Sequence, residues 1–237
     1  MTFTRVVRAV GELFLTVGAL LVLYVVYTVV WTNVEADQRS SRIVDDLREQ
    51  WATTAPGPAA STAPTAKPTS GAARPPAPGA PANGAGLALM VIPRLGGSWV
   101  SPVLEGVGDR SLTRGLGHYP RTALPGEIGN FSVAGHRATN GEPFARLDRV
   151  VKGDHVYVQT STAWHDYVVD STAIVARTEV SVVLPVPKRP GAEPTERKMT
   201  LTTCHPRWGS TQRLIVFSTL AATTSASAGP PAGAGLA

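Results

Sequence analysis

The feature that most constrains this 237-residue chain is a tract over residues 52–86 that is dominated by proline and alanine. Eight prolines lie there among Ala, Thr, Ser and Gly, a composition that cannot build a hydrophobic core and that favours extended, polyproline-like backbone. At about 3.1 Å per residue the tract could reach on the order of 100 Å when extended. We therefore expect a linker that separates an N-terminal segment from a globular domain.

The N-terminal segment contains an uncharged apolar run of 19 residues, from Leu13 to Trp31. At a rise of about 1.5 Å per residue, this run matches the ~30 Å of bilayer hydrocarbon. Arg5 and Arg8 precede the run and acidic residues follow it, so the positive-inside rule predicts a cytoplasmic N-terminus and an extracytoplasmic remainder. A cleaved signal peptide is the alternative, but its apolar region would usually be shorter. We expect residues 1–33 to form an uncleaved single-pass anchor in the cell membrane.

Residues 34–51 predict a short juxtamembrane helix. Ile43, Leu47 and Trp51 fall at i, i+4 and i+8, with Val44 beside them and charged residues elsewhere. Such an apolar stripe can lie along the membrane surface or pack on a partner, and a solvated, weakly helical stretch is an equal alternative. The sequence leaves these three interpretations open.

Residues 87–220 read as short β-rich runs separated by Gly and Pro turn residues. The runs cover residues 87–92, 131–136, 155–160, 165–176, 198–204 and 213–220. Several alternate apolar and polar residues, as half-buried antiparallel strands do, and only short helices fit, near 109–116 and 143–150. The pattern predicts an all-β domain, a closed or partly closed barrel or a sandwich. Residues 221–237, rich in Ser, Ala, Gly and Pro, are expected to be a disordered tail.

Composition argues against several function classes. Residues 87–220 carry 15 Lys/Arg against 11 Asp/Glu, scattered without a basic block or interleaved aromatic patch, so nucleic acid is not an expected partner. With one cysteine, no H-x-x-x-H pair and no clustered carboxylates, the spacing for a metal site is absent. No phosphate-cradling loop is present, and we expect no cofactor.

The lone cysteine, Cys204, has no intramolecular disulfide partner, so it is inert core, an intermolecular crosslink or a nucleophile. A cysteine nucleophile needs a proton carrier within reach and a positive or N–H-rich pocket for the oxyanion. Arg213 opens the run after Cys204, so antiparallel neighbours would bring both to the same end of a sheet. His136 ends the 131–136 run and is also at a strand end. His118 and His205 are rivals for the acid/base role, although His205 adjoins Cys204 and should point to the opposite face.

Several motifs resemble one enzyme family. TLTTC, residues 200–204, matches the TLxTC signature of sortases, and Arg213 and the histidine of VAGHR fit the catalytic trio of that family. GHYPRTALPGEIGNFSVAGHR (117–137), PF-x-x-L (143–147) and GD (153–154) resemble the class E sortases of actinobacteria most closely. The resemblance covers nearly all of residues 87–220.

The resemblance implies an eight-stranded sortase β-barrel and a transpeptidase. Cys204 would attack the Thr–Gly bond of a C-terminal sorting signal and form a thioester with the substrate threonine. His136 would protonate the leaving amine and later deprotonate the incoming one, while Arg213 would hold the signal backbone and stabilise the oxyanion. Tyr119 matches a tyrosine linked to preference for Leu-Ala-x-Thr-Gly signals, and Thr203 matches a threonine thought to assist oxyanion binding.

The implied partners are sorting-signal peptides of secreted proteins and an amino group of a peptidoglycan precursor, which would resolve the thioester. Two other functions stay open. One is a different extracytoplasmic cysteine enzyme acting on peptidoglycan, such as an L,D-transpeptidase, whose usual motif places His and Gly before the cysteine. The other is a non-enzymatic, membrane-tethered scaffold in which Cys204 is part of the core.

Overall fold

Helix α1 (Thr2–Thr54) is the longest element of the computed structural model, which describes residues 2–54 and 81–235. It joins the expected anchor and the expected juxtamembrane helix into one continuous helix, about 80 Å long at 1.5 Å per residue. Its stretch Arg5–Tyr27 is long and apolar enough to cross a bilayer and is not buried against the rest of the protein. Residues 52–54 of the proline-alanine tract extend α1, and residues 55–80 lie outside the described residues.

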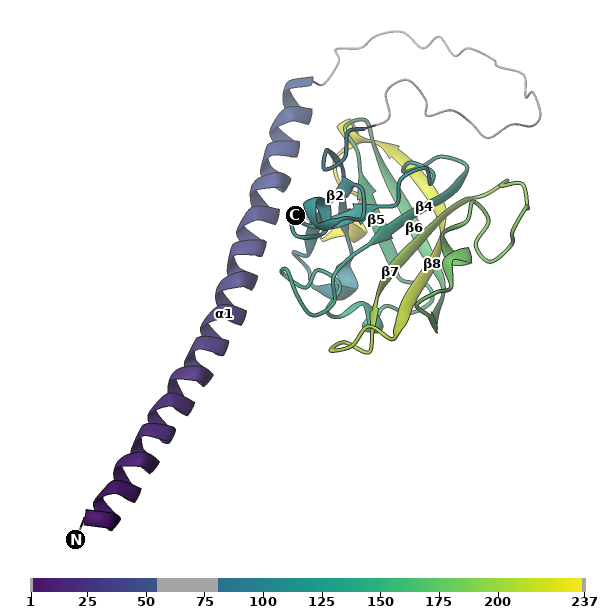
Figure 1. Ribbon diagram of the computed structural model, residues 1–237. Coiled ribbons are helices and arrows are strands. Elements are labelled where there is room, and N and C mark those ends of the chain that lie inside the picture. Colours follow the sequence, from purple (N-terminus) through teal and green to yellow (C-terminus); the bar gives the residue numbers. More distant parts are fainter. Residues whose placement is uncertain (1, 55–80, 236–237) are drawn as a thin grey trace.

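The globular part is a closed barrel in which the described residues form eight strands (Figure 1). The strands are β1 (Gly86–Val91), β2 (Val100–Glu105), β3 (Leu116–His118), β4 (Gly129–Ala134), β5 (His155–Gln159), β6 (Ala163–Ala176), β7 (Arg197–His205) and β8 (Gln212–Ser225). Their order around the barrel is β1-β2-β3-β4-β7-β8-β6-β5. The predicted closed barrel of eight strands is confirmed. Short helices fill the connections: η1 (Pro93–Leu95), α2 (Asp109–Leu112), η2 (Leu147–Arg149) and η3 (Val180–Val183).

Two of the eight strands, β2 and β3, were not visible as β-rich runs. β2 contains Pro102, which cannot donate to a ladder, and β3 has only three residues, too few to show an alternating pattern. Pro102 is tolerated because β3 pairs with β2 only from Val103 onward, so the strand has no neighbour on that side at the proline.

The strands β4, β7 and β8 present one apolar and one mixed face. Phe131, Val133, Met199, Leu201, Leu214 and Val216 belong to the buried core inside the barrel. Because successive strand residues point to opposite faces, the residues between them point outward. Cys204 lies on this outward face, in line with Thr200 and Thr202 of β7.

The stripe predicted on residues 34–51 packs on the barrel. Val44 and Leu47 are buried in a cluster with Leu89 of β1, and Ile43 and Trp51 contact the same cluster. Gly86 lies so close to Leu47 that a Cβ there would be 2.6 Å from the leucine Cδ2. Of the three interpretations left open, packing on a partner is the observed one, and the partner is the chain's own barrel.

The expected disordered tail over residues 221–237 is wrong for the part that the structure describes. Strand β8 continues to Ser225 because β6 extends alongside it, pairing Ala163 with Ser225. The helices η4 (Ala226–Ala228) and η5 (Ala232–Ala234) follow, and Ala234 is fully buried beside Tyr157 and Trp164. Small residues suit this segment since they let the backbone lie flat against the aromatic rings.

Candidate active site

The three predicted catalytic residues come from neighbouring parts of the barrel: two from the strands β7 and β8, and His136 from the turn after β4. Cys204 of β7 is directly opposite Arg213 of β8 in the antiparallel register. On the other side of β7, Ala134 of β4 is level with Thr202. His136 follows Ala134 by two residues, in the turn after β4 rather than in the strand itself. Because β7 lies between β4 and β8, the turn that carries His136 and the strand that carries Arg213 lie on opposite sides of the strand that carries Cys204.

Two residues before Cys204, Thr202 points to the same outward face of the sheet. Thr202 is level with Ala134 on one side and with Ile215 on the other. The Tyr119 hydroxyl lies 3.0 Å from Thr202 Oγ1, across 83 residues of sequence. The Tyr119 side chain is half-buried, and its hydroxyl meets β7 at Thr202, two residues before Cys204. This position is suited to contact with an extended peptide, which keeps Tyr119 a candidate for substrate binding.

Arg213 is half-exposed, and its guanidinium is held by its own turn. Its Nη1 donates to the carbonyl oxygens of Ser210 and Gln212, at 3.0 and 2.9 Å. These bonds use one of the nitrogens, so the guanidinium keeps donors for a substrate carbonyl or an oxyanion. The arrangement gives a fixed positive charge on the strand next to the thiol.

Thr203 supports the site from the inner face. Its hydroxyl donates to the carbonyl oxygen of Gly135 at 2.7 Å, and the residue is buried. Gly135 immediately precedes His136, so this bond fixes the backbone that carries the imidazole. The hydroxyl of Thr203 therefore has a structural partner on the face away from Cys204, and its direct contact with an oxyanion stays a prediction.

His136 is half-buried, and no described residue hydrogen-bonds its imidazole. Its main-chain carbonyl accepts from the N–H of Phe144 at 2.9 Å, which anchors the turn while the ring is left available. Burial lowers the pKa of His136, an effect that the carboxylate of Asp109 partly offsets. A lowered pKa favours the neutral ring, which is the form that accepts a proton from an attacking amine.

The same burial predicts how stability depends on pH. Burial also lowers the pKa of His165, so both histidines bind protons less readily in the folded chain than in the unfolded one. The free energy of unfolding should therefore be highest above the ordinary histidine pKa of about 6.5 and should fall as the pH drops below that value. We expect a lower melting temperature at about pH 5 than at about pH 7, with a shallower decline in His136→Gln and in His165→Gln. An unchanged slope in both variants would contradict this.

Arg137, next to His136, is a site residue that sequence reasoning missed. It is 5% exposed, and its Nη1 lies 3.4 Å from the carbonyl oxygen of Cys204 and 2.9 Å from the His205 ring Nδ1. Its Nη2 pairs with Asp148 of η2 at 3.1 Å. The β4–β7 ladder ends with the bond from Gly135 N to Thr202 O, so Arg137 continues the connection between the two strands beyond the ladder. Arg137 is the last residue of the VAGHR motif, but nothing in the motif indicated that its side chain would be buried against the end of β7.

Replacing Arg137 should impair catalysis more than binding. Arg137→Ala removes the bonds that hold the histidine turn against the cysteine strand, and a misplacement of about 1 Å can cost ~10²-fold in rate. We expect kcat to fall about 10- to 100-fold with KM nearly unchanged, and Arg137→Lys to recover part of the loss. Steady-state kinetics test this, with Arg146→Ala as the control. A fall confined to the melting temperature, with normal kcat, would show that Arg137 only stabilises the fold.

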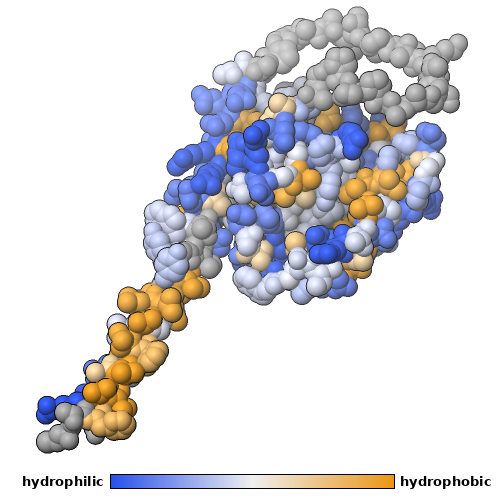
Figure 2. Space-filling view, viewed as in Figure 1, coloured by the Kyte–Doolittle hydropathy of each residue, from blue (hydrophilic) through white to orange (hydrophobic). Residues whose placement is uncertain are grey.

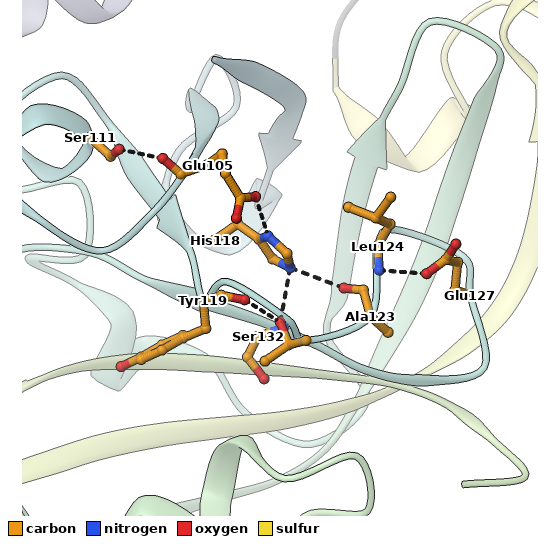
Figure 3. A network of polar contacts seen from close by, with 9 residues as sticks. Glu105, Ser111, His118, Tyr119, Ala123, Leu124, Glu127 and Ser132 are labelled. Atoms are coloured by element: carbon orange, nitrogen blue, oxygen red, sulfur yellow. Dashed lines mark hydrogen bonds and ion pairs between the residues drawn. The ribbon is translucent and has the colours of Figure 1, made fainter. Parts of the chain in front are cut away.

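The rival histidines have other partners. His118 is buried, with Nδ1 2.7 Å from Glu105 Oε2 and Nε2 within reach of Ala123 O and Thr122 Oγ1 (Figure 3). These contacts brace the segment that begins with Tyr119. The Nδ1 atom of His205 is bonded to Arg137, so this ring is held toward the turn after β4. In the described part of the chain, no three His, Cys, Asp or Glu side chains converge as metal ligands would.

Comparisons with known proteins show which proteins this chain is similar to. A protein-family model described as the sortase domain matches residues 90–221. Sortase SrtE1 of Streptomyces coelicolor is 35% identical over 232 residues, which cover 94% of this chain and 60% of that protein. Sortase SrtE2 of the same organism is 31% identical over 228 residues, covering 92% of this chain and 83% of that protein. The solved structure of sortase E from Streptomyces avermitilis matches with a TM-score of 0.59 and 44% identity, over 64% of this chain and 98% of that one.

Proposed function

Because the chain belongs to the sortase family of cysteine transpeptidases and is most like its class E members, we propose that it is a membrane-anchored sortase. It would cleave a C-terminal sorting signal between Thr and Gly and transfer the new carboxyl end to an amine of a peptidoglycan precursor. Helix α1 would hold it in the cell membrane, with the barrel outside.

The observation that carries this proposal is the cross-strand pair of Cys204 and Arg213, with His136 in the turn that follows the neighbouring strand β4. The Cys204–Arg213 pair is in register, and both residues are half-exposed on the outward face. A buried, inert cysteine would instead point into the barrel among Met199 and Leu201. Cys204 would be the nucleophile, His136 in the turn after β4 the proton carrier, and Arg213 on β8 the fixed cation, which together are what acyl transfer requires.

In the proposed reaction, the Cys204 thiolate attacks the carbonyl carbon of the substrate threonine. The C=O electrons move onto oxygen, and Arg213 stabilises that oxyanion. When the carbonyl re-forms, the C–N bond to glycine breaks and the leaving amine takes a proton from His136. The incoming amine then attacks the thioester, gives its proton to His136 and releases Cys204 as thiolate.

The preference for Leu-Ala-x-Thr-Gly signals is proposed through Tyr119. Its hydroxyl lies against Thr202, one row below the nucleophile on the same face. A peptide lying along β7 with its threonine at Cys204 would pass Tyr119 with the residues before the threonine. A small alanine there leaves room for the ring, which supports the proposal.

A thioester trapped on the full-length chain would test the function. The chain in lipid nanodiscs is incubated with a Leu-Ala-x-Thr-Gly peptide without an amine acceptor, and its intact mass is recorded. We expect a mass gain equal to the peptide up to its threonine less one water, mapped to Cys204, and no gain with a peptide in which Thr and Gly are exchanged. No adduct on a thiol that alkylates readily would indicate another cysteine enzyme, and an unreactive thiol would indicate the scaffold.

A further inference from the structure

The turn between β7 and β8 is linked to the outer end of the membrane-spanning stretch by direct contacts. Asn33 of α1 donates from Nδ2 to Glu142 Oε1 at 3.4 Å, and its Oδ1 accepts from Gly141 N at 3.4 Å. The other carboxylate oxygen of Glu142 pairs with Arg207 Nη2 at 2.5 Å. Arg207 lies three residues after Cys204, so a single glutamate bridges the membrane helix and the active-site turn.

These contacts set the height of the turn above the bilayer. Asn33 is two residues beyond Trp31, the end of the apolar run, which corresponds to about 3 Å along the helix. The polar headgroup layer extends roughly 5–8 Å beyond the hydrocarbon on each side. Asn33, and with it the Glu142 side chain that pairs with Arg207 of the turn, therefore lies at the depth of the headgroups. In Figure 1 the turn is at the lower end of the barrel, the end toward which the N-terminal half of α1 extends.

The turn carries side chains suited to that depth. Trp208 is 76% exposed, one of the large hydrophobic side chains that the barrel leaves uncovered, and the Arg207 guanidinium lies 5.1 Å from the centre of its ring. Tryptophan is enriched at membrane–water interfaces, and arginine pairs with lipid phosphates. Figure 2 shows the apolar side chains of the lower part of α1 giving way to polar ones where the helix meets the barrel.

We propose that Trp208 and Arg207 contact the headgroup region of the same membrane that α1 spans. The docked helix holds the barrel with its active-site end toward the lipid, so Cys204 works on substrates presented at the bilayer surface. The proposal rests on the proposed membrane anchoring of the chain. Its partner is the lipid interface.

Depth-dependent quenching would test the contact on the full-length chain. In a Cys204→Ala background, Trp208→Cys or Ser161→Cys supplies a single thiol for a fluorescent label. Ser161 is an exposed matched control at the other end of the barrel, since Ala163 pairs with the far end of β8. The proteins are placed in phosphatidylcholine vesicles with and without a lipid that carries a quencher just below its headgroup. We expect several-fold stronger quenching at 208 than at 161.

Three results would overturn the proposal. Equal quenching at both positions, in a chain that resists alkaline extraction from the vesicles, would show that α1 is inserted but the turn does not touch lipid. Extraction of the chain would show that the anchoring itself is wrong. A label at 208 that responds to a soluble muropeptide and not to the quencher would assign Trp208 to substrate binding. Both variants alter exposed residues, and unchanged melting temperatures would confirm that they fold.

Discussion

A Cys204→Ala variant should fold as the parent does and transfer no peptide. The side chain is half-exposed at a strand end, so its loss leaves no large cavity in the core. In a covalent mechanism the thiolate makes the first bond, and removing such a nucleophile lowers kcat by at least ~10⁴-fold. Peptide transfer is followed by mass spectrometry, with the melting temperature recorded beside it.

The controls for this variant use residues of the same region. Ser210→Ala, in the turn that follows Cys204, should keep full activity because only its main-chain carbonyl, which binds Arg213, is engaged. Transfer by Cys204→Ala at more than a trace would rule out the thioester mechanism. Since Cys204 is the only cysteine of the chain, no second thiol could take over its role.

Replacing Arg213 with alanine should cost about 10²–10³-fold in kcat, the typical effect of removing one oxyanion-stabilising donor. Arg213→Lys should recover only part of the loss, because an ammonium keeps the charge but lacks the planar donors of a guanidinium. KM should rise as well if the same side chain holds the signal backbone. Steady-state rates with a Leu-Ala-x-Thr-Gly peptide and an amine acceptor measure both effects.

Arg177→Ala is the matched control for Arg213. It removes an exposed arginine just beyond Ala176, which pairs with Gln212 on the neighbouring strand, so the net charge changes equally near the site. We expect its kcat to stay within about twofold of the parent, since exposed charges at a distance are screened. Equal losses in both variants would mean that Arg213 acts through general charge rather than by contact with the reacting atoms.

Local sequence was enough to predict most of the strands. Six of the eight strands show alternation or a β-rich run, because each has one face in the core. Strands β2 and β3 escaped, one through its proline and the other through its length. The tail after residue 220 was misjudged because small residues are common both in disordered segments and in segments that lie closely on aromatic rings.

The identity of the chemical groups was determined by the sequence alone, since a thiol, an imidazole and a guanidinium act through their own reactivity wherever they lie. The arrangement around them required the tertiary structure. β4 lies next to β7 through parallel pairing of strands far apart in the chain, which no local pattern encodes. Only that pairing brings Tyr119 to Thr202 and turns Arg137 toward the carbonyl of Cys204. Likewise, the stripe of α1 predicted a contact, but the complementary surface on β1 existed only once the barrel had closed.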